Sequence, residues 1–220
     1  MHSAVFLKIQ TETYAKFAHI HTQLLQGSKV SQADALGKVL SEMSCEVIDQ
    51  VFMVLLQENQ QYSQTGESEK VIQQILEAIR KYMPWSISFF GNDRLIPLVE
   101  YLSKTFQMEE GNIYMTYPVE DELVQQVKVS SQKLAEGNIN EIPKALKQLT
   151  EVIDLGVTHL LREPKKCLKF NFVVDKTLNG VIHMTTHLGY KRLEKLGTQI
   201  DSKSAMTYVD YFLQFMRDQI

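Results

Sequence analysis

Two histidines in the second half of the chain have the spacing of a pair of metal ligands. His183 and His187 stand at positions i and i+4 of the segment GVIHMTTHLG, so a helix would direct both imidazoles to one side. Zinc enzymes of the HExxH type share this spacing, but their catalytic glutamate follows the first histidine, where this chain has Met184. A third ligand would have to come from another helix, and the candidates are His19, His21, Asp154 and His159. The pair supports the hypothesis of a metal-dependent helical hydrolase. Histidines flanking a buried helical stripe are the simpler interpretation, under which no cofactor is expected.

The other patterns associated with catalysis or with nucleic-acid binding are weak. Ser130 and Lys133 match an SxxK spacing, but the companion motifs of serine acyl-enzymes are missing, as are GxSxG, GxxxxGK[ST], GxGxxG and ExxH segments. Two basic clusters lie in the second half, namely Arg162, Lys165, Lys166 and Lys169, and Lys191, Arg192 and Lys195. Acidic residues are interspersed with both clusters, and the chain has a formal net charge of −3. We therefore expect neither a nucleic-acid partner nor an enzyme of a familiar motif class.

An aromatic segment, PWSISFFGND, is the feature that helix packing explains least. Pro84 is expected to end one helix and Gly91 to open the next, so Trp85, Phe89 and Phe90 would lie on a connection between helices. Large apolar groups on a connection favour association unless something covers them. The segment therefore predicts a cavity mouth or a subunit interface, with Trp85 and at least one of the two phenylalanines in contact with a ligand or partner.

The elements that would position these residues are helices. Leu36 to Glu58 contains the longest apolar periodicity, and its Val51, Val54 and Leu55 are expected to be almost fully buried in a central helix. Further amphipathic stripes cover residues 10–26, 67–83, 95–106, 123–134, 143–161, 181–196 and 205–216. We also interpret residues 165–178 as helical, since a single strand in a helical chain would have no partner. The sequence therefore predicts an all-α fold, a helical bundle with no sheet beyond a stray hairpin.

The two halves of the chain resemble each other when one is shifted by 110 residues. The shift aligns Gly27 with Gly137, and the tetrapeptide VEYL at residues 99–102 with VDYF at residues 209–212. Few aligned residues are identical, but predicted loops align with predicted loops, and the apolar positions of the aligned helices fall on the same helical face. We therefore predict two tandem four-helix units, residues 1–110 and 111–220, related by internal duplication and packed as one globular domain. The counterpart of the Trp85 segment, EKLGTQIDS, has no aromatic residue, so the shared fold does not require one.

Composition narrows the location of the protein but not its activity. Apolar residues make up 44% of the chain and charged residues 22%, which is ordinary for a globular protein. No segment approaches the roughly 18 uncharged apolar residues of a membrane span, and the amino terminus lacks the pattern of a secretory signal. Cys45 and Cys167 have no metal-binding or disulfide spacing, so we expect reduced thiols and a cytoplasmic protein.

Three functional hypotheses follow from these observations. The first is a non-enzymatic helical binding or adaptor protein that engages a protein partner or self-associates, with the Trp85 segment as its anchor. The second is a carrier or sensor of an apolar small molecule, held in a cavity that the two halves enclose and that Met and Phe residues line. The third is the hydrolase built on His183 and His187.

Overall fold

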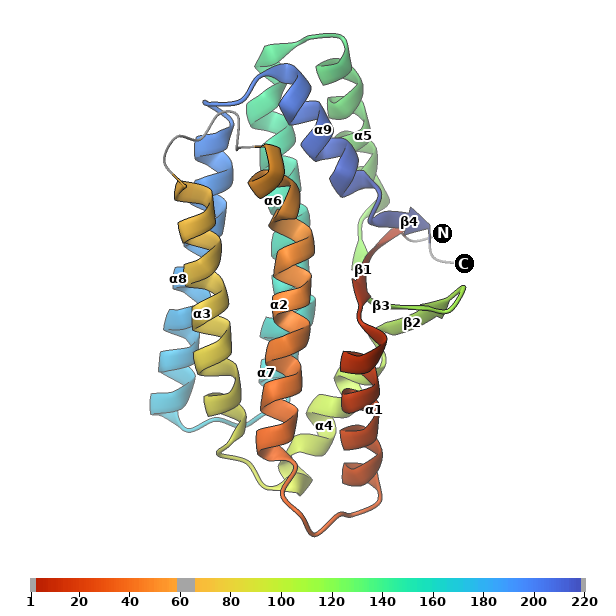
Figure 1. Ribbon diagram of the computed structural model, residues 1–220, viewed down its shortest axis with the longest axis vertical. Coiled ribbons are helices and arrows are strands. Elements are labelled where there is room, and N and C mark those ends of the chain that lie inside the picture. Colours follow the sequence, from red (N-terminus) through yellow and green to blue (C-terminus); the bar gives the residue numbers. More distant parts are fainter. Residues whose placement is uncertain (1–2, 59–65, 219–220) are drawn as a thin grey trace.

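The computed structural model describes residues 3–58 and 66–218, with side chains for all of these except residues 53–58. The first half contains β1 (Ser3–Ile9), α1 (Thr11–Leu25), α2 (Ala33–Glu58), α3 (Glu67–Ile87), α4 (Asn92–Ser103) and β2 (Phe106–Glu109). The second half contains β3 (Asn112–Val119), α5 (Asp121–Ala135), the short helix η1 (Ile139–Glu141), α6 (Ile142–Val157), the π-helical turn η2 (Thr158–Arg162), α7 (Glu163–Lys166), α8 (Phe172–Leu196), α9 (Ser202–Leu213) and β4 (Met216–Asp218). Most of the described residues are helical, and α6, η2 and α7 form one uninterrupted rod (Figure 1).

The prediction of an all-α helical bundle is confirmed in part: most of the described residues are helical, but they also form a four-stranded antiparallel sheet. Its strands are ordered β2-β3-β1-β4. The two central strands come from the amino-terminal segment and from the segment NIYMTYPV, which lies between the apolar stripes predicted at residues 95–106 and 123–134. They lie more than 100 residues apart in the chain, so no hairpin turn marks their pairing. Every residue of β1 except Lys8 is buried, so the strand shows a continuous apolar run and not the alternation of a half-exposed strand.

The sheet relates positions that lie 110 residues apart. Phe6 of β1 is paired with Thr116 of β3, and the register on either side of this pair is symmetric. The Phe6 N–H donates to the carbonyl of Phe215, and the Thr116 N–H donates to the carbonyl of Thr105, each over 2.7 Å. At the sheet edges, the pairing of Ser3 with Asp218 has its counterpart in the pairing of Ile113 with Met108. In each of these comparisons, adding 110 to a residue of the first half gives the matching residue of the second.

The helices lie in two layers that the sheet connects. The long helices α2, α3, α8 and the α6 rod run side by side, with α2 against β1 and the α6 rod against β3 (Figure 1). The pair α1 and α4 covers one end of the sheet, and the pair α5 and α9 covers the other (Figure 1). Val51 of α2 is buried, as expected for the central helix, whereas the side chains of Val54 and Leu55 lie outside the described residues.

Two other boundaries differ from the sequence-based expectation. Pro84 does not end α3, which continues to Ile87, so Trp85 lies on a helix and not on a connection. Proline costs a helix one hydrogen bond, and in the last turn the helix tolerates that loss. Residues 165–178 are helical only in part, since residues 167–171 separate α7 from α8.

Candidate functional site

An apolar cavity of about 210 Å³ lies between the long helices. Helices α2 and α3 form one wall, and the α6 rod with α8 forms the other, so both halves of the chain contribute to it. Residues of the sheet, including Met115 and Tyr117, close its inner side. The apolar lining includes Leu40, Met43, Val47, Phe52, Ala78, Ile79, Tyr82, Met83, Leu161, Phe170, Leu178, Val181 and Ile182. An apolar cavity of about 150 Å³ is sufficient to bind benzene, so this one has room for a larger hydrocarbon group.

The serine and threonine hydroxyls in the lining make hydrogen bonds within their own helices. Ser44 Oγ donates to the carbonyl of Leu40 over 2.8 Å, and Ser86 Oγ donates to the carbonyl of Met83 over 2.8 Å. Thr185 Oγ1 donates in the same way to the carbonyl of Val181, over 3.0 Å. These groups therefore need no partner inside the cavity. The rest of the wall is mainly hydrocarbon, which favours an apolar occupant over water.

Lys165 is the charged side chain in the lining that the structure describes. Its Nζ lies 2.5 Å from Asp175 Oδ1, and its side chain is 16% exposed while that of Asp175 is 44% exposed. The ammonium also lies 6.0 Å from the centre of the Phe170 ring. The Asp175 carboxylate accepts a hydrogen bond from one of the three N–H groups of the ammonium, and it lies on the more exposed side of Lys165. Lys165 can therefore offer a donor to a negatively charged or polar group at this end of the cavity.

The π-helical turn η2 shapes the wall beside α8. A π turn adds a residue to the helical repeat, and here the consecutive residues Leu160 and Leu161 both line the cavity. Above this turn, Tyr190 of α8 donates a hydrogen bond over 2.6 Å to Asp154 of α6, and Arg162 lies 2.9 Å from the same carboxylate. Burial, followed by the hydrogen bond to Asp154, raises the pKa of Tyr190 well above its usual value. The Tyr190 and Lys165 contacts connect the rod to α8 at two heights, and the cavity-lining residues of the rod and α8 lie between them.

The histidine pair lies on the outer side of α8. His183 and His187 are both exposed, with ring centroids 6.1 Å apart and nearly parallel planes. Among residues 3–58 and 66–218, no group of three His, Cys, Asp or Glu residues is arranged to hold a metal ion. The backbone carbonyl of His159 accepts a hydrogen bond from Tyr101. The metal hypothesis thus continues to rest on the spacing of the two histidines.

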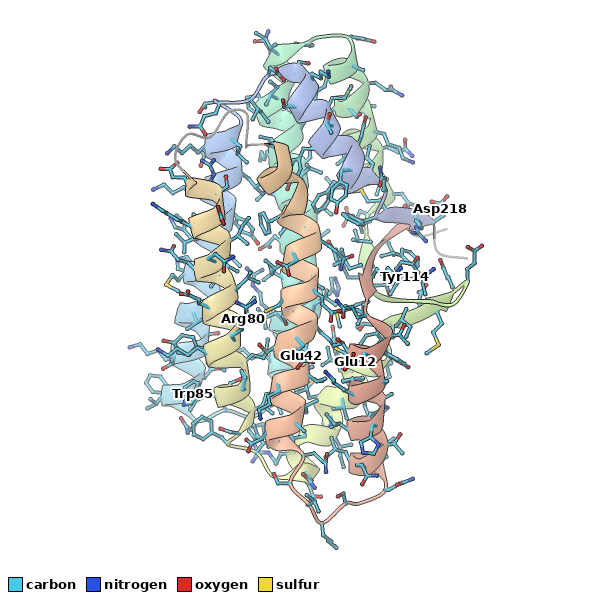
Figure 2. All side chains as sticks on the ribbon, viewed as in Figure 1. Glu12, Glu42, Arg80, Trp85, Tyr114 and Asp218 are labelled. Carbon is cyan, nitrogen blue, oxygen red and sulfur yellow. The ribbon has the colours of Figure 1, made fainter. Side chains whose placement is uncertain are left out.

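The aromatic segment contributes to the cavity through neighbours that the sequence analysis did not select. Trp85 is 37% exposed and Phe89 is 53% exposed, whereas Phe90 is buried. The Phe90 ring contacts the ring of Phe170 in an edge-on arrangement at 5.0 Å. Trp85 packs edge-on against Tyr82 at 6.1 Å, and Figure 2 places Trp85 on the outside of the helical layer. Phe170 and Tyr82 line the cavity, so Trp85 and Phe90 lie one layer behind its wall.

Other residues that the sequence analysis considered have structural partners. Ser130 is fully buried and donates to Glu141 Oε1 over 2.8 Å, while Lys133 lies 3.6 Å from the same carboxylate group. Arg192 and Lys195 both contact Glu67 at the start of α3. Cys45 and Cys167 are free thiols, and burial raises the pKa of Cys45. None of the helices in the described part of the chain is long and apolar enough to cross a membrane.

Comparison of the chain with protein-family models, with curated proteins and with solved structures finds no match. The cavity and its surroundings are therefore the basis for a functional proposal.

Proposed function

We propose that the protein binds a small, largely apolar molecule in the cavity between its long helices, and acts as a carrier or sensor of that molecule. The observation that carries the proposal is the apolar cavity itself. Its volume of about 210 Å³, the internal hydrogen bonds of its serine and threonine hydroxyls and its mainly apolar lining all favour such an occupant. Of the three hypotheses raised by the sequence, the carrier or sensor thus has the most specific support.

The position of Lys165 narrows the chemistry of the ligand. A molecule with a hydrocarbon body and one anionic group can fill the apolar part and direct that group to the Lys165 ammonium. Charge-assisted hydrogen bonds of this kind stabilise a complex by about 1.5–3 kcal/mol, which corresponds to roughly tenfold or more in affinity. A long-chain carboxylate is the simplest molecule of this class.

The test compares dodecanoate with dodecanol, which has the same chain but no charge. We expect the protein to bind both, with dodecanoate the tighter ligand, as measured by isothermal titration calorimetry and native mass spectrometry. Lys165→Met keeps the aliphatic part of the side chain, so it should weaken dodecanoate binding about tenfold and leave dodecanol binding nearly unchanged. Lys147→Met, on the exposed side of α6, is the control and should change neither.

Two results of this test would lead to different conclusions. If neither ligand binds to the wild-type protein, the proposed function is wrong. If both bind but Lys165→Met leaves the preference for dodecanoate intact, the cavity is a site for apolar molecules and Lys165 takes no part in recognition.

We also infer that the two halves descend from one duplicated unit and that the cavity formed at the contact between the copies. The symmetric register around Phe6 and Thr116 supports this inference. So do two tyrosines 110 residues apart. Tyr101 donates to the carbonyl of His159 in the second half, and Tyr211 donates to the carbonyl of Gln50 in the first, each over 3.0 Å. Superposing residues 10–107 on 120–217 should align the helices in the same order and direction, and a different order would contradict the inference.

A further inference from the structure

Four exposed apolar side chains lie at one end of the helical layer. Phe172 and Val173 in the first turn of α8 are 79% and 70% exposed, and Trp85 and Phe89 lie at the end of α3. The edge-on contact between Phe90 and Phe170 joins the two segments just beside these residues. The end of α3 and the start of α8 lie at the same end of the molecule (Figure 1), and Trp85 is labelled there in Figure 2. We call Trp85, Phe89, Phe172 and Val173 the apolar end.

Two positive charges lie over aromatic rings adjacent to the apolar end. Lys81 Nζ lies 5.0 Å from the centre of the Tyr82 ring, and the Arg94 guanidinium lies 5.4 Å from that of Phe90. Arg94 also donates a hydrogen bond to the backbone carbonyl of Lys169 over 2.9 Å, which brings two cationic residues together at this end. Residues 81–94 and 163–176 together contain six Lys and Arg against three Asp and Glu, whereas the rest of the chain contains 17 against 23. The two segments that carry the apolar end thus have a net positive charge, while the rest of the chain has a net negative charge.

We propose that the apolar end docks peripherally on an anionic lipid surface. Tryptophan and phenylalanine side chains insert at the boundary between lipid headgroups and acyl chains, and lysine and arginine around them attract anionic headgroups. The side chains of the apolar end are inserted while the helices stay outside the hydrocarbon. A protein partner would be an alternative occupant, but the combination of exposed rings with a cationic border matches the chemistry of an anionic bilayer more closely.

Docking at this end would bring the cavity close to the membrane. Tyr82 packs against Trp85, Phe170 packs against Phe90, and both Tyr82 and Phe170 line the cavity. An apolar ligand could then pass between bilayer and cavity over a short path through hydrocarbon side chains. The docking itself does not depend on this exchange, so it can be tested in the absence of any ligand.

The sequence provides its own reporter, because Trp85 is the single tryptophan of the chain. We expect its fluorescence to shift to shorter wavelength and the full-length protein to sediment with vesicles of phosphatidylcholine and phosphatidylglycerol. Vesicles of phosphatidylcholine alone should bind weakly, and high salt should release the protein from the anionic vesicles. Absence of sedimentation with anionic vesicles at low salt would overturn the proposal.

Matched substitutions separate the apolar end from a general surface effect. The double variant Phe172→Glu and Val173→Glu should weaken vesicle binding about tenfold or more, since it removes two inserting side chains and adds negative charge. The control is Ile139→Glu, at a residue that is likewise exposed, by 64%. Ile139 lies in the connection between α5 and α6, which is at the other end of the molecule (Figure 1), so this substitution should not change vesicle binding. Equal losses in both variants would contradict the assignment. A native mass of two chains, with a Trp85 shift that depends on protein concentration and needs no lipid, would assign the apolar end to a second copy instead.

Discussion

The variant Ala78→Phe is expected to bind dodecanoate about 100-fold more weakly than the wild-type protein, or weaker still, which corresponds to about 2.7 kcal/mol of binding free energy. Ala78 lies on α3, is 7% exposed and lines the cavity, so a phenyl ring at this position projects into the space that the ligand needs. The same substitution should leave the fold intact, because side chains that fill a pre-existing apolar cavity commonly add about 0.5–2 kcal/mol of stability. Loss of binding together with an unchanged or higher melting temperature is the expected signature.

A control on the same helix distinguishes blocking of the cavity from added hydrophobicity. Gln74 is exposed, so Gln74→Phe adds the same ring to α3 on the solvent side and should bind dodecanoate as the wild type does. Ala78→Leu fills less of the cavity and should give an intermediate affinity. If Ala78→Phe folds and binds as tightly as the wild-type protein, the ligand occupies some other place and the proposed function loses its site.

The helices could be predicted from the sequence because each carries its own signal. The periodicity of three and four residues in α2 persists from Leu36 to Leu55, and one apolar face is enough to identify it. The sheet carries no such local signal. β1 finds its partner β3 only after about a hundred residues, and its continuous burial removes the alternation by which a strand is usually found. The expectation of no sheet failed because both central strands were overlooked together, whereas residues 165–178, to which the lone-strand argument was applied, contain no strand.

A cavity between the two halves was one of the hypotheses raised by the sequence, but its lining residues could not be assigned, because a residue that lines an empty space has the same sequence pattern as one that packs against a neighbour. Leu161 and Ile182 follow the same helical spacing as fully buried core residues such as Leu149. One signal was present. Val157, Leu161 and Leu168 continue an apolar stripe, and Lys165 occupies a position of that stripe between them. A cation on the buried face of a helix indicates a partner inside the fold, and the sequence analysis instead grouped Lys165 with a surface cluster.

The largest effect on stability is expected at the crossing of α2 and α3. A Cβ atom on Gly37 would lie 2.7 Å from Pro84 Cα and 3.2 Å from the Pro84 carbonyl oxygen. Both are backbone atoms, so no rotation of a side chain can relieve the contact, and the helices must move apart. Alanine improves helix propensity over glycine by about 1 kcal/mol, while overpacking costs about 1–3 kcal/mol, so Gly37→Ala should be destabilising overall. Gly37→Val adds two more methyl groups at the same place and should lose about 3 kcal/mol.

Gly180 provides the matched control, because it lies inside α8 and an added Cβ meets no atom within 4 Å. Gly180→Ala should therefore gain up to about 1 kcal/mol in free energy of unfolding, measured by urea denaturation alongside the Gly37 variants. Equal gains for Gly37→Ala and Gly180→Ala would show that α2 and α3 do not approach as closely as described. The crossing also matters for function, since Pro84 is followed directly by Trp85 and then by Ser86 and Ile87 of the cavity lining. A displaced α3 would move the apolar end and the cavity wall together, so Gly37→Val should weaken vesicle binding and dodecanoate binding in the same preparation.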